Sequence, residues 1–156
     1  MVSIKQKNNI RLQRQLKDVK KQFAGAAKRA VVNEIRKSIL RGVTPVKGVT
    51  PRRFEKYSDS YKDAIESGQV VGKSRVRPVN LKVTGKLLRD LKSKRKGTKI
   101  IVFFDNVLAD IHNRLGAGKA KTIRRILPTK EGEELSTNIM KNLRRILVKT
   151  VRKILR

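Results

Sequence analysis

The sequence contains no cysteine and no tryptophan, and its only aromatic residues besides histidine are four Phe and two Tyr. Without cysteine the chain can form no disulfide, no thiolate zinc site and no cysteine nucleophile. Proteins that bind single-stranded nucleic acid by base stacking need exposed aromatic rings, which this composition supplies poorly. The absences therefore argue against a disulfide scaffold, a zinc finger and a stacking platform.

Groups that carry out catalysis are also scarce. The chain has one histidine, His112, and 12 acidic residues among 156. A lone histidine without cysteine or clustered carboxylates cannot build a common transition-metal site. There is no nucleophile elbow and no spaced carboxylate pair, and the GAGK stretch at Gly116–Lys119 lacks the spacing of a phosphate loop. The sequence predicts no enzymatic activity, no metal and no cofactor, and it predicts a mobile loop at residues 116–119.

Long apolar runs are missing as well. No segment approaches the roughly 20 apolar residues that span a bilayer, and the N-terminal residues MVSIKQKNNIRLQRQ contain no signal-peptide core. We therefore expect a soluble protein, or a part of a soluble assembly.

Positive charge is what the sequence has in excess, because 41 Lys and Arg give a formal net charge of +29. Self-repulsion of this size destabilises a compact monomer, so we expect a negatively charged partner. Nucleic acid is the first candidate, an acidic protein the second and an anionic membrane surface the third. Leu, Ile, Val and Phe make up about 30% of the chain, which is above the range of disordered chains and predicts a folded core.

The apolar periodicity predicts a long amphipathic helix from Asn9 to Arg41, ended by Gly42. Its apolar stripe consists of Leu12, Leu16, Val19, Phe23, Ala27 and Ala30, followed by Val31, Ile35 and Ile39. The opposite face is basic, and it is either solvated or a binding face: Arg14, Lys17, Lys21, Lys28 and Arg36. About 30 helical residues extend roughly 45 Å. This is long for one small core, so we expect part of the helix to pack against a neighbouring subunit.

Shorter elements are predicted in the centre of the chain. They are a short helix in the locally acidic segment 54–66, a strand at 79–83, a helical turn at 87–91 and a strand at 99–104. The basic run between Lys92 and Lys99 is expected to form a hairpin tip. Asp105 is expected to cap a short helix, 106–113, that closes one end of the sheet, with His112 as a hydrogen-bonded structural residue.

The clearest helix is predicted after Pro128. Thr129 is its expected N-cap, and Glu131, Glu133 and Glu134 suit its positive N-terminal end. From residue 137 onward, apolar and basic residues occupy opposite halves of the helix and no acidic residue occurs. Such a helix can lie on a membrane, but we interpret its apolar half as core.

The order helix, small sheet, helix predicts an α+β fold. We expect a long N-terminal helix, a small and mostly antiparallel sheet with short helical turns, and an amphipathic C-terminal helix. The expected organisation is a single domain, 1–156. It comprises a long basic helix at 1–44, an α+β core at 45–136 and the basic end of the C-terminal helix at 137–156.

Three basic clusters are candidates for contact with DNA or with a partner protein, because phosphate contact needs only cations within reach. The candidates are Lys92, Lys94, Arg95 and Lys96 at the hairpin; Arg124 and Arg125, with Lys119 and Lys121, before the last helix; and Arg145, Lys149, Arg152 and Lys153 in that helix. The hairpin is slightly favoured, since a flexible tip can enter a channel. No helix-turn-helix or zinc-finger spacing occurs, so we expect contacts that do not depend on base sequence.

Four segments, taken in order, resemble one protein family. They are PVKG with FEKYSDSYKDAI (Pro45–Ile65), PVNLKVTGKLLRDLK (Pro78–Lys92), FFDNVLADIHN (Phe103–Asn113) and GAGKAKTIRRILPTKEGEELS (Gly116–Ser136). Together they resemble the head–tail joining proteins of tailed bacteriophages, the neck or tail-completion class of virion morphogenesis proteins. The most specific patterns are L-x-V-T-G-x-L-L and I-H-N followed by R-R-I-L-P-T. The long N-terminal helix lies outside the resemblance and stays unassigned.

The resemblance implies a structural virion protein without enzymatic activity. Such subunits form rings, here expected to hold six or twelve copies, between the portal and the tail, and packaged double-stranded DNA passes through the lumen. The implied partners are further copies of the chain, portal or adaptor proteins, and tail-terminator or tail-tube proteins. The implied location is the neck or tail top of the virion, after assembly in the host cytoplasm.

Composition leaves a second interpretation open. A basic nucleic-acid-binding protein of the host kind, ribosome-associated or nucleoid, would carry a similar excess of positive charge. A membrane-surface protein is a distant third.

Overall fold

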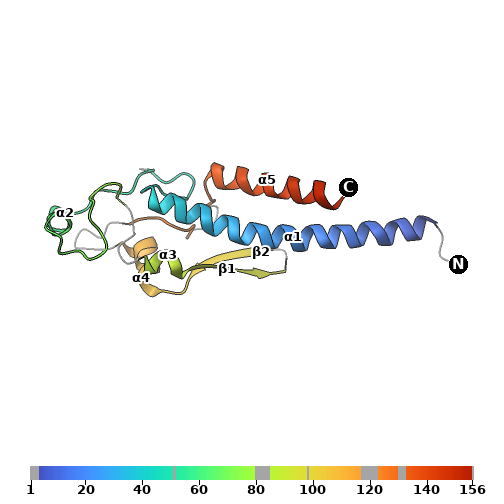
Figure 1. Cartoon of the computed structure of the whole chain (residues 1–156), viewed down its shortest axis with the longest axis horizontal. Helices are drawn as coiled ribbons and strands as arrows, with labels where there is room; N and C mark the ends of the chain where they lie inside the picture. Colours follow the sequence, from blue (N-terminus) through green and yellow to red (C-terminus); the bar gives the residue numbers. More distant parts are fainter. Residues whose placement is uncertain are drawn as a thin grey trace.

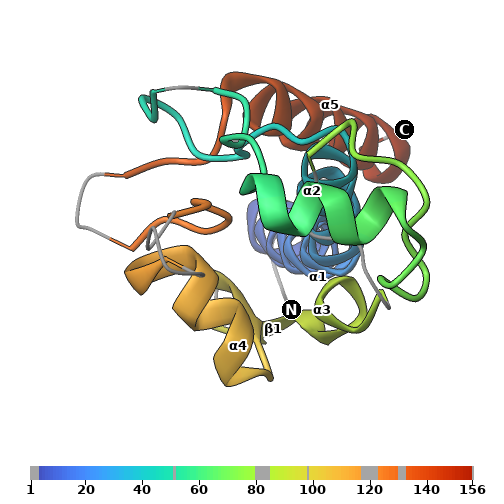
Figure 2. The same ribbon diagram turned by 90° about the vertical axis from the view of Figure 1, so that its left-hand side faces the viewer.

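The computed structural model describes residues 4–50, 52–79, 85–97, 99–116, 123–129 and 133–155. Figure 1 shows an elongated molecule built around one long helix, α1 (Ile4–Leu40). Helix α5 (Thr137–Ile154) lies antiparallel along one side of α1. The antiparallel hairpin of β1 (Leu91–Lys96) and β2 (Lys99–Phe104) lies along the other side (Figure 2). This arrangement confirms the predicted α+β fold.

The shorter elements gather at the end of the molecule farthest from the N-terminus (Figure 1). They are α2 (Asp59–Glu66), α3 (Lys86–Asp90), α4 (Val107–Asp110) and η1 (Ile111–Leu115), a π-helical turn that continues α4. The predicted short helix in 54–66 occupies only the second part of that segment, and the predicted helical turn at 87–91 corresponds to α3. The strand expected at 79–83 falls almost entirely on residues 80–84, which lie outside the described residues.

The C-terminal end of α1 is set by glycine, as predicted. Gly42 has φ +69°, and its N–H donates to the carbonyl of Ile39 at 3.0 Å while the N–H of Val43 donates to that of Ser38 at 3.0 Å. This is the Schellman motif, which ends a helix on a left-handed residue. The helix begins at Ile4, earlier than the predicted Asn9, because the preceding Lys and Gln residues are good helix formers without being apolar.

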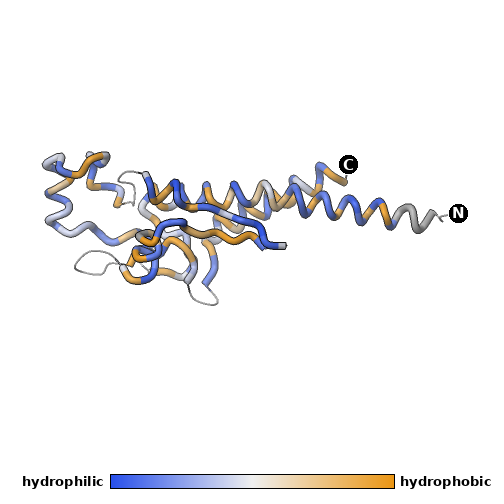
Figure 3. Tube along the Cα trace, turned by 90° about the horizontal axis from the view of Figure 1, so that it is seen from below, coloured by the Kyte–Doolittle hydropathy of each residue, from blue (hydrophilic) through white to orange (hydrophobic). Residues whose placement is uncertain are grey.

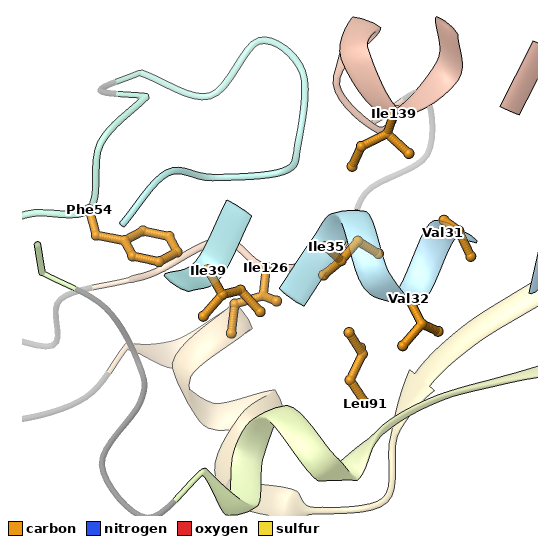
Figure 4. Packing of buried hydrophobic residues seen from close by; sticks show 8 residues of the cluster. All are labelled: Val31, Val32, Ile35, Ile39, Phe54, Leu91, Ile126 and Ile139. Atoms are coloured by element: carbon orange, nitrogen blue, oxygen red, sulfur yellow. The ribbon is translucent and has the colours of Figure 1, made fainter. Parts of the chain in front are cut away.

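The core lies between α1 and the elements on its two sides. Figure 4 shows Ile35 and Ile39 of α1 directed toward Leu91 of the hairpin and Ile126, with Ile139 of α5 above them. All five side chains are buried. Because both sides of α1 are covered along this stretch, its buried residues form more than the single stripe that the periodicity predicted.

The basic face predicted opposite that stripe is therefore partly covered. The guanidinium of Arg36 is half-buried and donates to the carbonyls of Leu88 at 2.8 Å and Leu91 at 3.1 Å. The Ser93 hydroxyl of β1 donates to the carbonyl of Lys28 at 3.2 Å. The Arg36 side chain and the Lys28 backbone thus help to hold the hairpin, and the Arg36 guanidinium is not part of a free binding face.

The basic run that was expected to form a flexible hairpin tip lies mostly in a strand. In the register, Lys92 pairs with Phe103, Lys94 with Ile101 and Lys96 with Lys99, so the lysines of the run belong to the strand and not to a loop. The strand extends through the lysines because the backbone of β1 pairs with that of β2 along the whole register, while Ile100, Val102 and Phe104 of β2 pack against the core. Side chains alternate along a strand, so the lysines of β1 point to one face only.

The start of the C-terminal helix was predicted too early. The N–H of Lys47 donates to the carbonyl of Glu134 at 2.8 Å, and the N–H of Ser136 donates to the carbonyl of Pro45 at 2.7 Å. These bonds hold residues around Leu135 in an extended bridge with Val46, so the helix begins only at Thr137, with Ser136 as N-cap. Thr129 is no helix cap, and its N–H instead donates to the Glu133 carboxylate at 2.6 Å.

The expected cap of the helix after β2 is also wrong. The Asp105 carboxylate forms an ion pair with Lys92. The N–H of Ala109 in the first turn of α4 donates to the backbone carbonyl of Asn106 at 3.1 Å. The attraction of the Lys92 ammonium on β1 explains why the Asp105 carboxylate points toward the hairpin.

Candidate nucleic-acid interface

The outer face of the hairpin carries the first group of candidate cations. Leu91 and Ser93 contact the α1 side, so the alternation places Lys92, Lys94 and Lys96 on the face away from α1. Lys94 Nζ lies 5.2 Å from the centre of the Phe103 ring. The hydrogen bond with Asp105 raises the pKa of Lys92. Lys94 and Lys96, and Lys99 opposite Lys96 on β2, are cations of this face that have no carboxylate partner among the described residues.

Arg95 belongs to the other face of β1. It alternates with the lysines, and its Nε donates to the carbonyl of Gly97 at 2.7 Å. The side chain is exposed, but this bond ties it to the hairpin turn. The predicted cluster of four therefore separates into a row of lysines and one arginine that supports the turn.

Helix α5 carries the second group. Arg145, Lys149, Arg152 and Lys153 are all exposed, as the amphipathic pattern predicted. Ile139 is the only buried residue of α5, while Met140, Leu147 and Val148 are exposed, so only part of the apolar half that was interpreted as core is covered. The hairpin and α5 lie on opposite sides of α1 (Figure 2). The structure therefore does not bring these two groups of candidate cations together.

The third group is not a free surface. Arg124 was a candidate for contact with DNA or with a partner protein, but only 7% of it is exposed. Arg125 is half-buried, and its guanidinium donates to the Thr129 hydroxyl while its carbonyl accepts from the Thr44 hydroxyl at 2.7 Å. Residues 123–129 are drawn into the body because Ile126 belongs to the core. Lys119 and Lys121 lie outside the described residues.

Arg124 takes part in a buried cation–π cluster. Its Cζ lies 5.7 Å from the centre of the Tyr57 ring, and Lys73 Nζ lies 5.0 Å from the same ring. Burial lowers the pKa of Arg124, while Tyr57, Glu55 and Tyr61 act in the opposite direction. Attraction to a ring face offsets part of the cost of burying a cation, by about 0.5–2 kcal/mol. This cluster was not predicted, since Lys73 and Tyr57 are far from Arg124 in sequence and only the fold brings them together.

His112 occupies a half-buried position beside this cluster. Its backbone carbonyl accepts from the N–H of Arg124 at 2.9 Å. The ring Nδ1 is buried and has no hydrogen-bond partner in the described part of the chain. Burial, followed by the charge of Arg124, lowers the pKa of His112. The prediction that the His112 ring is hydrogen-bonded is therefore wrong for Nδ1. The hydrogen bond that holds this residue is the one accepted by its backbone carbonyl.

The structure adds a feature that sequence reasoning missed, a groove of about 660 Å³ between α1 and α5. Four cations line it, two from each helix: Lys21, Arg29, Lys149 and Lys153. Gly25 and Ala26 lie between the two cations of α1. The spacing of four residues between Lys149 and Lys153 and of eight between Lys21 and Arg29 is visible in the sequence. The packing of α1 against α5, which brings the two pairs together, is not.

A second groove, of about 570 Å³, lies between β2, α4 and residues 127–129. It is lined mainly by apolar side chains, with Asp105 and Asp110 at its border. Asp110 forms an ion pair with Arg114 at 2.8 Å. Among the described residues, no group of three His, Cys, Asp or Glu side chains is placed to hold a metal ion. Within the same ranges, none of the helices has the length and apolar character that crossing a bilayer requires.

Comparisons with protein-family models, with curated proteins and with solved structures find no match to this chain.

Proposed function

We propose that this chain is a structural subunit of a tailed-phage neck, which forms a ring and joins the portal or head to the tail around the DNA channel. The observation that carries the proposal is the uncovered N-terminal part of α1. Leu12 and Leu16, on the same stripe as buried Val19, are 53% and 55% exposed. Helix α5 ends opposite Gln15, whose side chain donates to the carbonyl of Ile154 at 3.4 Å, so α1 continues beyond it (Figure 3).

The charge distribution along the molecule supports the same proposal. A ring closes through heterologous contacts, which require two different and complementary surfaces on each subunit. The N-terminal part of α1 exposes Arg11, Arg14 and Lys17, whereas α2, at the opposite end, exposes Asp59, Asp63 and Glu66 (Figure 1). The three carboxylates of α2 can pair with the cations of α1 in a neighbouring copy, which suits a head-to-tail contact. The four family-like segments between residues 45 and 136 support the same class of protein.

The proposed role is mechanical and requires no catalytic group. The test is the mass of the full chain by native mass spectrometry, combined with mass spectrometry and imaging of purified virions. We expect six or twelve copies in a ring between portal and tail. A density map of the virion without any copy of this chain between portal and tail tube would refute the proposal.

A second candidate is a basic nucleic-acid-binding protein of the host kind, and the net charge of +29 favours it. This candidate predicts that the chain co-sediments with ribosomes or with the nucleoid and is absent from purified virions. The same fractionation therefore separates the two candidates.

A further inference from the structure

We propose that the groove between α1 and α5 binds the phosphate backbone of duplex DNA. This inference names the surface that meets DNA and rests on the DNA contact of the proposed function. The groove is defined by the four cations Lys21, Arg29, Lys149 and Lys153, with Asp18, Gln22, Gly25, Ala26 and Thr150 as its remaining lining. Its lining thus has two cations on each wall and one carboxylate.

These four cations are not neutralised within the described chain. None of them forms an ion pair there, and the Asp18 carboxylate has no cation within ion-pair distance either. All four side chains are exposed. Four uncompensated cations around one groove repel one another, so a negatively charged occupant would stabilise the pair of helices.

The dimensions of the groove suit a row of phosphates better than a single carboxylate. Lys21 and Arg29 are eight residues apart on α1, which corresponds to about 12 Å along the helix axis. One strand of B-DNA presents a phosphate about every 3.4 Å of duplex axis. Because the strand winds around the duplex, its own path is longer than this axial rise, so about two phosphates of one strand lie along the stretch and can meet cations of both walls.

The middle of the groove is open because of its small residues. A Cβ placed on Gly25 would meet no heavy atom within 4 Å, and Ala26 next to it is also small. A long side chain at either position would occupy the path between the two walls. No aromatic or amide-rich surface for reading base edges lines the groove, apart from Gln22, so binding through it is independent of sequence.

The experiment measures binding of the full-length protein to a fluorescent 20-base-pair duplex between about 50 and 200 mM salt. Two charge variants test the walls, Lys21→Gln with Arg29→Gln and Lys149→Gln with Lys153→Gln. Each lost phosphate contact should lower the slope of log affinity against log salt by about one. We expect each double variant to lower the slope by about two and to weaken binding at least tenfold at the lower salt.

A matched control removes the same charge on the other side of α1. Lys94→Gln with Lys96→Gln lies on the outer face of the hairpin, and we expect a much smaller change in slope. An equal loss in this control would show that DNA attraction follows net charge and not the groove, which would overturn the inference. The same conclusion follows if both groove variants bind like the original chain.

A second pair of variants tests the groove without removing any cation. Gly25→Glu places a carboxylate between the walls and should abolish most of the binding. Gly25→Ala adds only a methyl group and a better helix former, so we expect unchanged DNA binding and equal or higher thermal stability. Unchanged binding in Gly25→Glu, with an intact circular dichroism spectrum, would contradict the inference.

The outcome is separable from the neck function. If groove variants bind DNA normally while rings and particles form, the groove inference fails and the neck function stands. If the groove variants lose DNA binding but the chain is absent from virions, the groove binds DNA and the neck function fails.

Discussion

His112 shows how a single buried group can make stability depend on pH. Its Nδ1 is buried without a hydrogen-bond partner among the described residues, and Arg124 lies close enough to disfavour a second positive charge. The lowered pKa means that the folded chain holds this ring neutral at a pH where the unfolded chain has already bound a proton. It is the only histidine in the sequence, so its contribution can be isolated.

We predict that the free energy of unfolding decreases as the pH falls from about 7 toward 5. The unfolded histidine titrates near 6.5, and the folded pKa is lower, so the unfolded state binds the extra proton first. The slope for one proton is at most about 1.4 kcal/mol per pH unit. Urea unfolding of the original chain and of His112→Gln measures it, and the variant should lose the slope in this window. Parallel pH profiles would contradict the assignment.

Position 42 requires glycine because of its left-handed backbone conformation and because of the atoms next to it. Its φ is +69°, and a Cβ there would lie 2.2 Å from the carbonyl oxygen of Val79. We predict that Gly42→Ala lowers the free energy of unfolding by at least about 2 kcal/mol. Gly48 is the matched control, because its φ is +77° but a Cβ would meet nothing within 4 Å. Gly48→Ala should cost about 1 kcal/mol, the strain of a left-handed residue alone, and equal losses would refute the clash.

One side chain of the turn after β2 accepts two hydrogen bonds from the core segment 123–129. Asn113, on the π-helical turn η1, is buried, and its Oδ1 accepts from the N–H of Ile126 at 2.6 Å and of Leu127 at 2.8 Å. Two separate segments are thereby fixed to each other. A buried N–H that loses its partner costs about 1–3 kcal/mol.

We predict that Asn113→Ala lowers the free energy of unfolding by about 2–4 kcal/mol, since two N–H groups lose their acceptor. The exposed Asn33 on α1 serves as control, and Asn33→Ala should change stability by less than about 0.5 kcal/mol. Thermal or chemical unfolding of the two variants measures the difference. A change below about 1 kcal/mol for Asn113→Ala would mean that the segments are held by other contacts.

At the scale of the whole molecule, the N-terminal part of α1 leaves large apolar side chains exposed. Leu12 and Leu16 lie on either side of Gln15, the residue of α1 that contacts the end of α5, and neither contributes to the core. We predict that Leu12→Gln with Leu16→Gln changes the stability of the monomer by less than about 1 kcal/mol but lowers the oligomer fraction. Native mass spectrometry at several concentrations measures this fraction.

The control is an apolar residue exposed at the other end of the molecule. Val71 is 84% exposed and lies after α2, so Val71→Gln removes apolar surface without touching α1. If the two α1 substitutions leave the oligomer as it is, or if the control disrupts it equally, the end of α1 is not the subunit contact.

Several features could be predicted from the order of residues alone because they depend on local periods. The 3.6-residue repeat of apolar positions in α1 and α5, the β-branched and aromatic run at 99–104 and the glycine after α1 all correspond to observed elements. Side-chain alternation and helix periodicity act between near neighbours. For the same reason, the basic residues of α5 were correctly expected to be exposed.

Other features depend on contacts between distant parts of the chain. The start of α5 depends on hydrogen bonds between residues 45–47 and 134–136, and the burial of Arg124 depends on Tyr57 and Lys73. The grouping of Lys21 and Arg29 with Lys149 and Lys153 requires that two helices more than 100 residues apart pack antiparallel. Charge and propensity predict that a cation will be somewhere on a surface. Which cations share one groove depends on helix packing, which no local pattern encodes.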